Sequence, residues 1–331
     1  MLQRKTFLTL AAGLALGASL PAWAQGSAAT PAFPPKPVRI VVASSAGSGP
    51  DAAMRAVGEK LSQKWGQPVI IDNRPGGNGF IAVSAFKNAQ PDGHELINLY
   101  SSHMTTHPHT FSRLPYDPQK DFEPVRPLLL TDFFVVVAKD SPFKTLDDIV
   151  AAAKAQPGKV TYGSWFNGSP GHLGGLRLQA LKGLEMTHVP FKEMPQLYTA
   201  VATQEVQWAL GSVGSAGAME KAGKVRFIAI AAPARLPLYA DVPATAESAS
   251  SKGYEVNAWV GLFAPKGTPK AVREKIAADM TEVLNSPELV ERYRTLGYLP
   301  MHMAPDAFAQ RMVSDTQGWA KIIRDANLKL D

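Results

Sequence analysis

The chain has 331 residues, of which 34 are basic and 28 acidic, so its formal net charge is +6, and it contains no cysteine. Without cysteine there is no disulfide and no lipid anchor on a thiol. The basic residues are scattered and form no run of the kind that follows a nucleic-acid backbone, so nucleic acid is excluded as a partner. A chain of roughly 300 residues exceeds the usual size of one hydrophobic core, which favours two lobes.

The N-terminus has the pattern of an export signal. Arg4 and Lys5 precede an apolar run over 7–20, and the small-residue triplet 22–24 follows. This pattern predicts a signal peptide at 1–24 and delivery to the periplasm. The apolar run, about 14 residues, is shorter than the roughly 20 that span a bilayer. Arg4-Lys5 is one residue away from a twin-arginine signal, so both the folded and the ordinary unfolded export route stay open.

After the signal peptide, apolar runs rich in Val and Ile alternate with amphipathic segments. We expect strands at 38–43, 69–72 and 96–100, helices at 51–66 and 80–89, and glycine loops at 44–49 and 74–79. Such alternation predicts parallel strands joined by crossover helices. The pattern breaks around 114–117 and 124–127, where we place the first crossing between lobes.

The same alternation continues in the second half of the chain. We expect strands at 133–138, 160–162, 187–190, 206–210 and 225–231, helices at 146–155 and 172–182, a returning strand at 259–264, and helices at 271–284 and 305–326. The prediction is an α/β protein with two Rossmann-like lobes around a central cleft. Lobe I takes 25–126 and 256–331, lobe II takes 127–255, and the hinges lie near 126 and 256.

The loop after the first strand has the composition of an anion site. Small side chains let backbone amides approach a ligand, and Pro50 suits the first turn of a helix whose positive end faces the loop. The alternative is a tight turn closed by a capping aspartate. The candidate residues of this loop are Ser44, Ser45, Gly47, Ser48, Gly49 and Asp51.

A matching loop stands in the second half, again after a strand and before a helix. Asn167 and Ser169 are candidate hydrogen-bond donors to a ligand, with Gly168 between them. His172 is either a ligand contact or a buried histidine that fixes the loop. We expect two helix termini, one per lobe, to face one cleft.

One competing interpretation is a periplasmic enzyme with a dinucleotide. The segment 47–52 satisfies the relaxed dinucleotide fingerprint, and Asp72 ends the next strand, where a ribose-binding acid would lie. The export signal and the segment 73–77 that follows directly weaken this interpretation. We therefore expect no enzyme activity and no cofactor.

Two other enzyme signals are weaker. A hydrolase elbow needs glycines two residues before and two residues after its serine, and Ser169 has Asn167 and Gly171 at these positions, so it fails. A metal centre is suggested by three histidines, but their irregular segment favours packed or solvated side chains and no metal. The three are His103, His107 and His109.

Many short motifs resemble the Bug family, the extracytoplasmic solute receptors of tripartite tricarboxylate transporters. They are PKPVRIVV at 35–42, the glycine loop ending at Asp51, GQPV at 66–69, NRPG at 73–76, PDG at 91–93, LPYD at 114–117, PGK at 157–159, NGS at 167–169, HL at 172–173, VPFK at 189–192 and AGK at 222–224. The resemblance covers essentially the whole chain after the signal peptide, in order.

The resemblance implies a type II periplasmic binding protein that closes on a small carboxylate and delivers it to membrane subunits of a transporter. The carboxylate would lie between the loops 44–51 and 167–172, partly through ordered water. The remaining lining implied by the resemblance is Ser101, Ser102, Gly211 and Ser212. We expect a monomer; a ligand sensor for a signalling partner is the alternative role.

This sequence departs from the family pattern near the expected ligand. The residues 43–46 stand where Pro-Phe-Pro is usual, Gly211 where an acid is common, and Glu193 where a glycine is. Losing the acid at Gly211 disfavours an amino acid as ligand. Trp165 and Phe166 nearby would suit an aromatic or hydrophobic acid.

Overall fold

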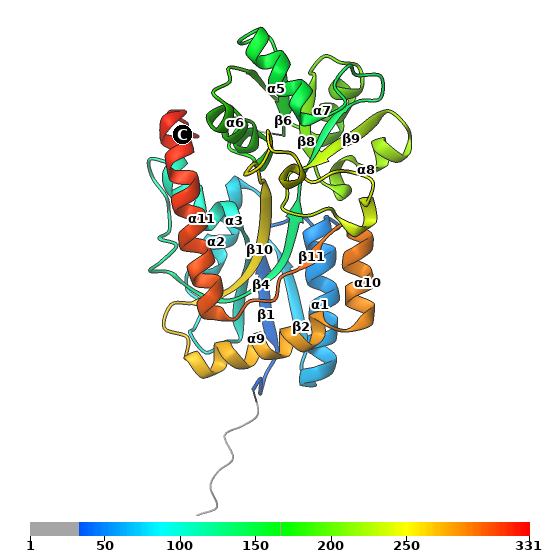
Figure 1. Cartoon of the computed structure of the whole chain (residues 1–331). Helices are drawn as coiled ribbons and strands as arrows, with labels where there is room; N and C mark the ends of the chain where they lie inside the picture. Colours follow the sequence, from blue (N-terminus) through cyan, green and yellow to red (C-terminus); the bar gives the residue numbers. More distant parts are fainter. Residues whose placement is uncertain (1–32, 166) are drawn as a thin grey trace, which may run out of the picture. The chain divides into compact units, whose positions relative to one another are not determined.

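The computed structural model describes residues 33–165 and 167–331, so the expected signal peptide at 1–24 lies outside the described residues. The described chain forms two β-sheets (Figure 1). The first contains, in spatial order, β11 (Leu299–Pro300), β4 (Phe122–Asp132), β10 (Asn257–Pro265), β3 (Glu95–Tyr100), β1 (Val38–Val42) and β2 (Val69–Asn73). The second contains β7 (Thr187–Pro190), β6 (Thr161–Ser164), β8 (Trp208–Gly211), β5 (Phe134–Ala138) and β9 (Val225–Ile230).

Both sheets are mixed. Strand β1 runs parallel to β2 and β3, and β6 runs parallel to β7 and β8. Strand β10 is antiparallel to β3 and β4, and β5 is antiparallel to β8 and β9. The chain leaves the first sheet after β4, builds the second, and returns through β10, so the adjacent strands β4 and β10 belong to one sheet although more than a hundred residues separate them.

Helices cover both sheets. Around the first sheet lie α1 (Gly49–Trp65), α2 (Phe80–Phe86), α3 (Ser101–Thr105), α4 (His107–Thr110), α9 (Lys270–Leu284), α10 (Pro287–Leu296) and α11 (Pro305–Asp325). Around the second lie α5 (Leu146–Ala155), α6 (Pro170–Lys182), α7 (Met194–Ala202) and α8 (Val213–Lys221). One core joins the first sheet to α1, α9 and α10, a second joins it to α2 and α11, and a third fills the other half.

Local sequence explains where the helices start and stop. Pro50 lies in the first turn of α1, and Gly66 ends the helix in the left-handed conformation, φ 65°. Helix α5 starts with a capping box in which Thr145 accepts from the Asp148 amide and Asp148 accepts from the Thr145 amide. These signals account for the agreement between expected and observed helices in these segments.

The expected break at 124–127 is wrong, because β4 runs unbroken from Phe122 to Asp132. Prolines are rare inside strands because they lack the N–H that the ladder needs. Here the pairing of β4 with β10 shifts register twice, next to Pro124 opposite Phe263 and next to Pro127 opposite Gly261. These β-bulges accommodate both prolines.

The expected α/β architecture with two sheets is confirmed, although several elements besides β4 were not anticipated. They include α3, α4, α7, α8, α10 and the short strand β11. Among the described residues no helix combines the length and apolarity needed to cross a membrane.

A glycine in α6 gives a test of this packing. A Cβ at Gly175 would overlap the ring of Tyr162, which is buried under the helix, so Gly175→Ala should lower the free energy of unfolding by about 1–3 kcal/mol. Gly318 in α11 has open space where its Cβ would stand, so Gly318→Ala should raise it by about 0.5–1 kcal/mol. Urea unfolding measures both, and opposite signs are expected; a neutral Gly175→Ala would contradict the packing.

Candidate ligand-binding site

A cavity of about 630 Å³ lies where residues from both sheets meet. This size is within the range of about 300–1,000 Å³ typical of small-molecule sites. We call it the neutral cavity, because no Asp, Glu, Lys, Arg or His stands among the described residues that line it. They are Gly47, Ser48, Gly49, Pro50, Ala52, Tyr100, Ser101, Ser102, Leu129, Thr131, Phe133, Trp165, Pro170, Met194, Ser212, Gly214, Ser215, Ala258, Val260, Leu296 and Tyr298.

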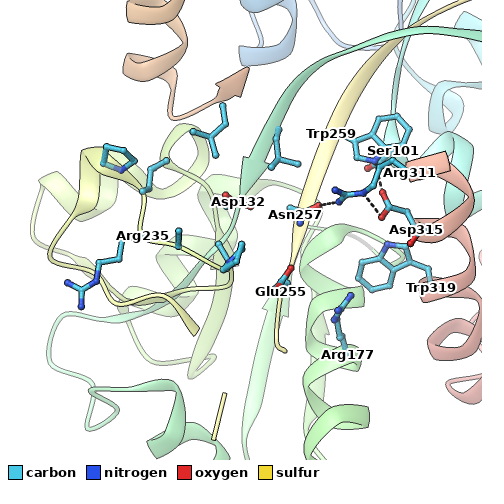
Figure 2. A pocket seen from close by; sticks show the side chains of 18 residues that line it. Ser101, Asp132, Arg177, Arg235, Glu255, Asn257, Trp259, Arg311, Asp315 and Trp319 are labelled. Atoms are coloured by element: carbon cyan, nitrogen blue, oxygen red, sulfur yellow. Dashed lines mark hydrogen bonds and ion pairs between the residues drawn. The ribbon is translucent and has the colours of Figure 1, made fainter. Parts of the chain in front are cut away.

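A second cavity of about 540 Å³ lies on the opposite face of the β4–β10 pair (Figure 2). Successive side chains of a strand point to opposite faces. On β4, Leu129 and Thr131 line the neutral cavity whereas Leu130 and Asp132 line the second one. On β10, Ala258 and Val260 face the first, and Asn257 and Trp259 face the second. The two faces of the strand pair thus line two chemically different spaces, and Ser101 lines both.

The loop before α1 is held by one buried carboxylate. Asp51 is 1% exposed, and its oxygens accept from the Gly47 amide at 2.8 Å, from Asn73 Nδ2 at 2.8 Å and from Arg55 Nε at 3.0 Å. Burial by itself raises the pKa of Asp51, but these hydrogen bonds outweigh it and hold the pKa below its usual range. Asp51 therefore stays ionised and holds the loop through its hydrogen bond with the Gly47 amide.

The start of α1 presents backbone donors to the neutral cavity. Gly47 and Gly49 line it with main-chain atoms, because they have no side chain. The amides of Gly49 and Asp51 have no hydrogen-bond partner within the described chain. Unpaired amides at the positive end of a 17-residue helix attract an anion.

Two tyrosine hydroxyls stand next to this helix terminus. A Cβ at Gly49 would overlap the Tyr298 hydroxyl, which shows how closely the ring approaches the loop. Burial raises the pKa of Tyr298 to about 12, with a smaller contribution from Tyr100, and burial also raises the pKa of Tyr100 to about 12. Both phenols therefore remain protonated at neutral pH and can donate to a bound anion.

The second helix terminus at the cavity belongs to α8. Ser212 caps α8 by accepting from the Ser215 amide, and the Ser215 hydroxyl accepts from the Ser212 amide in return. Gly214 lines the cavity with its backbone, and its amide has no partner within the described chain. The Tyr198 hydroxyl lies 2.8 Å from Ser215 Oγ and fixes the cap from behind.

The loop before α6 is placed differently from the expectation. Asn167 is exposed, whereas Ser169 is fully buried and its hydroxyl caps α6 by accepting from the His172 amide. His172 Nδ1 accepts from the Gly168 amide at 3.0 Å, and a Cβ at Gly168 would lie 2.6 Å from Leu330. None of these four residues lines the neutral cavity; among the described residues of this segment, Pro170 and Trp165 reach it.

His172 has the alternative role left open by the sequence, that of a buried histidine fixing the loop. Its ring stacks on His188 with centroids 3.9 Å apart, and His188 Nε2 lies 2.7 Å from Ser164 Oγ. Burial lowers the pKa of His172 to about 4, and burial together with His172 lowers the pKa of His188 to about 3. Both imidazoles are neutral structural groups.

Of the other sequence candidates, some reach the neutral cavity and some do not. The structure brings together Gly47, Ser48, Gly49, Ser101, Ser102 and Ser212. It leaves outside the lining Ser44, Ser45, Asp51 and Gly211. Gly211 is enclosed, since a Cβ there would lie 2.8 Å from Ala216, so an acid at this position would not fit.

Several lining residues were not expected from the sequence. Tyr298 and Leu296 come from the end of α10, far along the chain, and only the folded topology brings them beside α1. Ser212 was expected from the family resemblance, whereas Ser215, its partner in a serine capping box, was not, because Gly214 and Gly217 weaken the helical pattern behind the box.

The three histidines between 103 and 109 are packed rather than arranged for a metal. His103 and His107 are buried with ring centroids 5.0 Å apart, and His107 Nδ1 lies 3.2 Å from the Tyr116 hydroxyl. Burial lowers the pKa of His103 to about 4. Within the described residues no group of three or more His, Cys, Asp or Glu could hold a metal ion.

The second cavity carries the charges that the first lacks. Figure 2 shows Arg311 between Asp315, at 2.7 Å, and Asn257, at 3.1 Å, on the side of α11. Arg177 of α6 lies over the ring of Trp319, 5.6 Å from its centroid. Its other lining residues include Asp132, Arg235, Glu255 and Trp259.

Comparison with known proteins identifies relatives of the whole chain. Residues 53–328 match the model of the tripartite tricarboxylate transporter family receptor. A Pseudomonas sp. protein named "UPF0065 protein in tcbD-tcbE intergenic region" is 32% identical over 297 residues, which cover 90% of this chain and 88% of that protein.

Solved structures agree with these matches. The R. palustris protein Rpa4515 with adipate has a TM-score of 0.77 and 26% identity, covering 90% of this chain and 99% of that one. The periplasmic binding protein BugD has a TM-score of 0.72 and 26% identity, with coverage of 90% and 99%. These likenesses confirm the expected fold class of a two-lobed periplasmic binding protein and the resemblance to the Bug family.

Removing the carboxylate under the α1 loop tests its structural role. Asp51→Ala leaves the Gly47 amide without its acceptor and removes one of the two acceptors of Asn73 Nδ2, so the free energy of unfolding should fall by about 1–3 kcal/mol. The exposed Asp140 is the control, and Asp140→Ala should change the free energy of unfolding by less than about 0.5 kcal/mol. Equal losses in urea unfolding would show that Asp51 does not support the loop.

Asp132 gives a prediction of pH dependence. Burial raises the pKa of Asp132 to about 6, Glu255 adds to the effect, and Arg311 opposes it. The folded state then binds this proton more tightly than the unfolded state, so Asp132 makes the protein less stable as pH rises from about 4 to about 6. Asp132→Asn should therefore raise Tm at pH 7.5, and the difference from wild type should vanish near pH 4. A difference independent of pH would contradict this origin.

Proposed function

Because the chain belongs to the tripartite tricarboxylate transporter receptor family, we propose that it binds a small carboxylate in the neutral cavity and delivers it to the membrane subunits of such a transporter. The observation that carries the proposal is the pair of helix termini, α1 and α8, whose glycine backbones line one cavity from the two sheets. The relative solved with adipate supports a carboxylate as the ligand.

The anchoring of the carboxylate follows from the donors at the cavity. The amides of Gly49 and Gly214 approach from opposite sheets, and Tyr298 adds a neutral hydroxyl next to the α1 terminus. In a site without bulk water such fixed donors bind an anion without any basic side chain. Ser101, Ser102 and Ser212 supply further hydroxyls, some of which would act through ordered water.

Ligand binding would favour a closed arrangement of two lobes. We place lobe I around the first sheet and lobe II around the second, with the crossings at Phe133, between β4 and β5, and at Val256, just before β10. The first crossing lies seven residues after the hinge expected near 126, and the second lies at the position expected near 256. A ligand that touches both helix termini only in the closed state shifts the population toward closure.

We further propose a periplasmic receptor without enzymatic activity. The signal expected at 1–24 and the family both support the compartment. The rival dinucleotide site needs a free acid at Asp72, but this carboxylate accepts from Arg39 at 2.7 Å and from Arg74 at 3.0 Å. An acid held by two guanidinium groups is poorly placed to bind a ribose.

Calorimetric titration of the mature protein with a panel of mono- and dicarboxylates tests the proposal. At least one should bind with measurable heat and raise Tm by mass action. Tyr298→Phe removes one hydroxyl next to the α1 terminus and should weaken that ligand about tenfold or more, as expected for a hydrogen bond to a charged group.

Tyr293→Phe is the matched control. Tyr293 is buried in the same half of the molecule, its ring centroid lies 6.3 Å from that of Tyr298, and it does not line the neutral cavity. This control should leave affinity within twofold of wild type. No binding by any carboxylate, or equal losses in both variants, would refute the proposed site.

A further inference from the structure

We propose that the ligand is a monocarboxylate with an extended apolar body, such as a medium-chain fatty acid, and neither a dicarboxylate nor an amino acid. This inference rests on the proposed function and names the class of carboxylate that the neutral cavity selects. The inferred ligand differs from adipate, the dicarboxylate with which the relative Rpa4515 was solved.

The first observation is the separation of charge between the two cavities. Asp132, Glu255 and three arginines line the second cavity, on one face of the β4–β10 pair, and no charged side chain of the described chain lines the other. A second carboxylate inside the neutral cavity would find no cation, and an ammonium group would find no acid. Burying an unpaired ion costs several kcal/mol.

The second observation is the amount of negative charge that the two helix termini can balance. A helix N-terminus is equivalent to about half an elementary positive charge, so α1 and α8 together balance about one carboxylate. The Asp51 carboxylate does not line the cavity and already forms an ion pair with Arg55. The site is therefore matched to a single negative group between Gly49 and Gly214.

The third observation is the apolar wall beyond that point. Leu129 and Val260 are buried on the crossing strands, and Leu296 closes the wall from α10. Phe133 and Trp165 form an aromatic pair with centroids 5.7 Å apart. A ligand is stabilised by such a wall when it buries its own apolar groups there, by about 0.8 kcal/mol for each buried CH₂.

Three ligands with eight carbons separate the alternatives in calorimetry. They are octanoate, octanedioate and 2-aminooctanoate, which share one carboxylate and differ only in a second charge. Octanoate should bind at least a hundredfold more tightly than the other two. Within the series butanoate, hexanoate and octanoate, affinity should rise about fourfold for each added methylene.

A variant that introduces a cation should invert this preference. Met194 lines the neutral cavity from the start of α7 and is 38% exposed, so Met194→Lys can be made without disturbing the core. It should tighten octanedioate at least tenfold and weaken octanoate. The control is Val313→Lys on α11, where the side chain is 50% exposed and lines neither cavity, and it should change neither affinity more than twofold.

The outcomes distinguish this inference from the proposed function. If octanedioate or 2-aminooctanoate binds as tightly as octanoate, or if affinity is independent of chain length, the inference is overturned while the carboxylate receptor stands. If folded protein binds none of these ligands and no other carboxylate, both are refuted.

Discussion

The pairing of β4 with β10 is the constraint on which the site depends. These strands are neighbours in the first sheet, and they carry the chain to and from the second sheet. Because side chains alternate along a strand, one pair of strands gives a largely apolar, uncharged face to one cavity and a face with Asp132 and Asn257 to the other. The β-bulges next to Pro124 and Pro127 lie outside the stretch that lines the cavities, so residues 129–132 and 257–260 keep the regular alternation.

The chemistry of the neutral cavity follows from what the backbone supplies there. Glycines at 47, 49 and 214 expose main-chain atoms, and phenol and serine hydroxyls surround them. Ionised groups near the site are used elsewhere: Asp51 holds the α1 loop, and Asp72 is bound by Arg39 and Arg74. A neutral lining with oriented donors binds one anion, and apolar contact stabilises the rest of the ligand. This is the basis for inferring a monocarboxylate with an apolar body.

The sequence predicted the first half of this site because its signals are local. A strand, a small-residue loop and a helix with Pro50 in its first turn lie next to one another, and the structure has them in that order. The loop at 167–172 has the same local pattern, yet its polar groups are consumed by Ser169 capping α6 and by His172 holding Gly168. Local pattern does not reveal which amides are already paired.

The rest of the site depends on contacts between distant parts of the chain. Tyr298 lies beside α1 because α10 packs against α1. Gly214 lies in α8, where two glycines obscure the helical pattern in the sequence. The fold class could be predicted without such contacts. The alternation of strands and helices and a chain too long for one lobe were sufficient. Side-chain environments across the cavity required the assembled sheets.

The most direct test is a crystal structure of the mature protein grown with octanoate. The account predicts the carboxylate within hydrogen-bond distance of the Gly49 and Gly214 amides, with the alkyl chain against Leu129 and Val260. Octanoate bound instead beside Arg177 and Arg311 in the second cavity, or a carboxylate that contacts only one of the two helix termini, would contradict it.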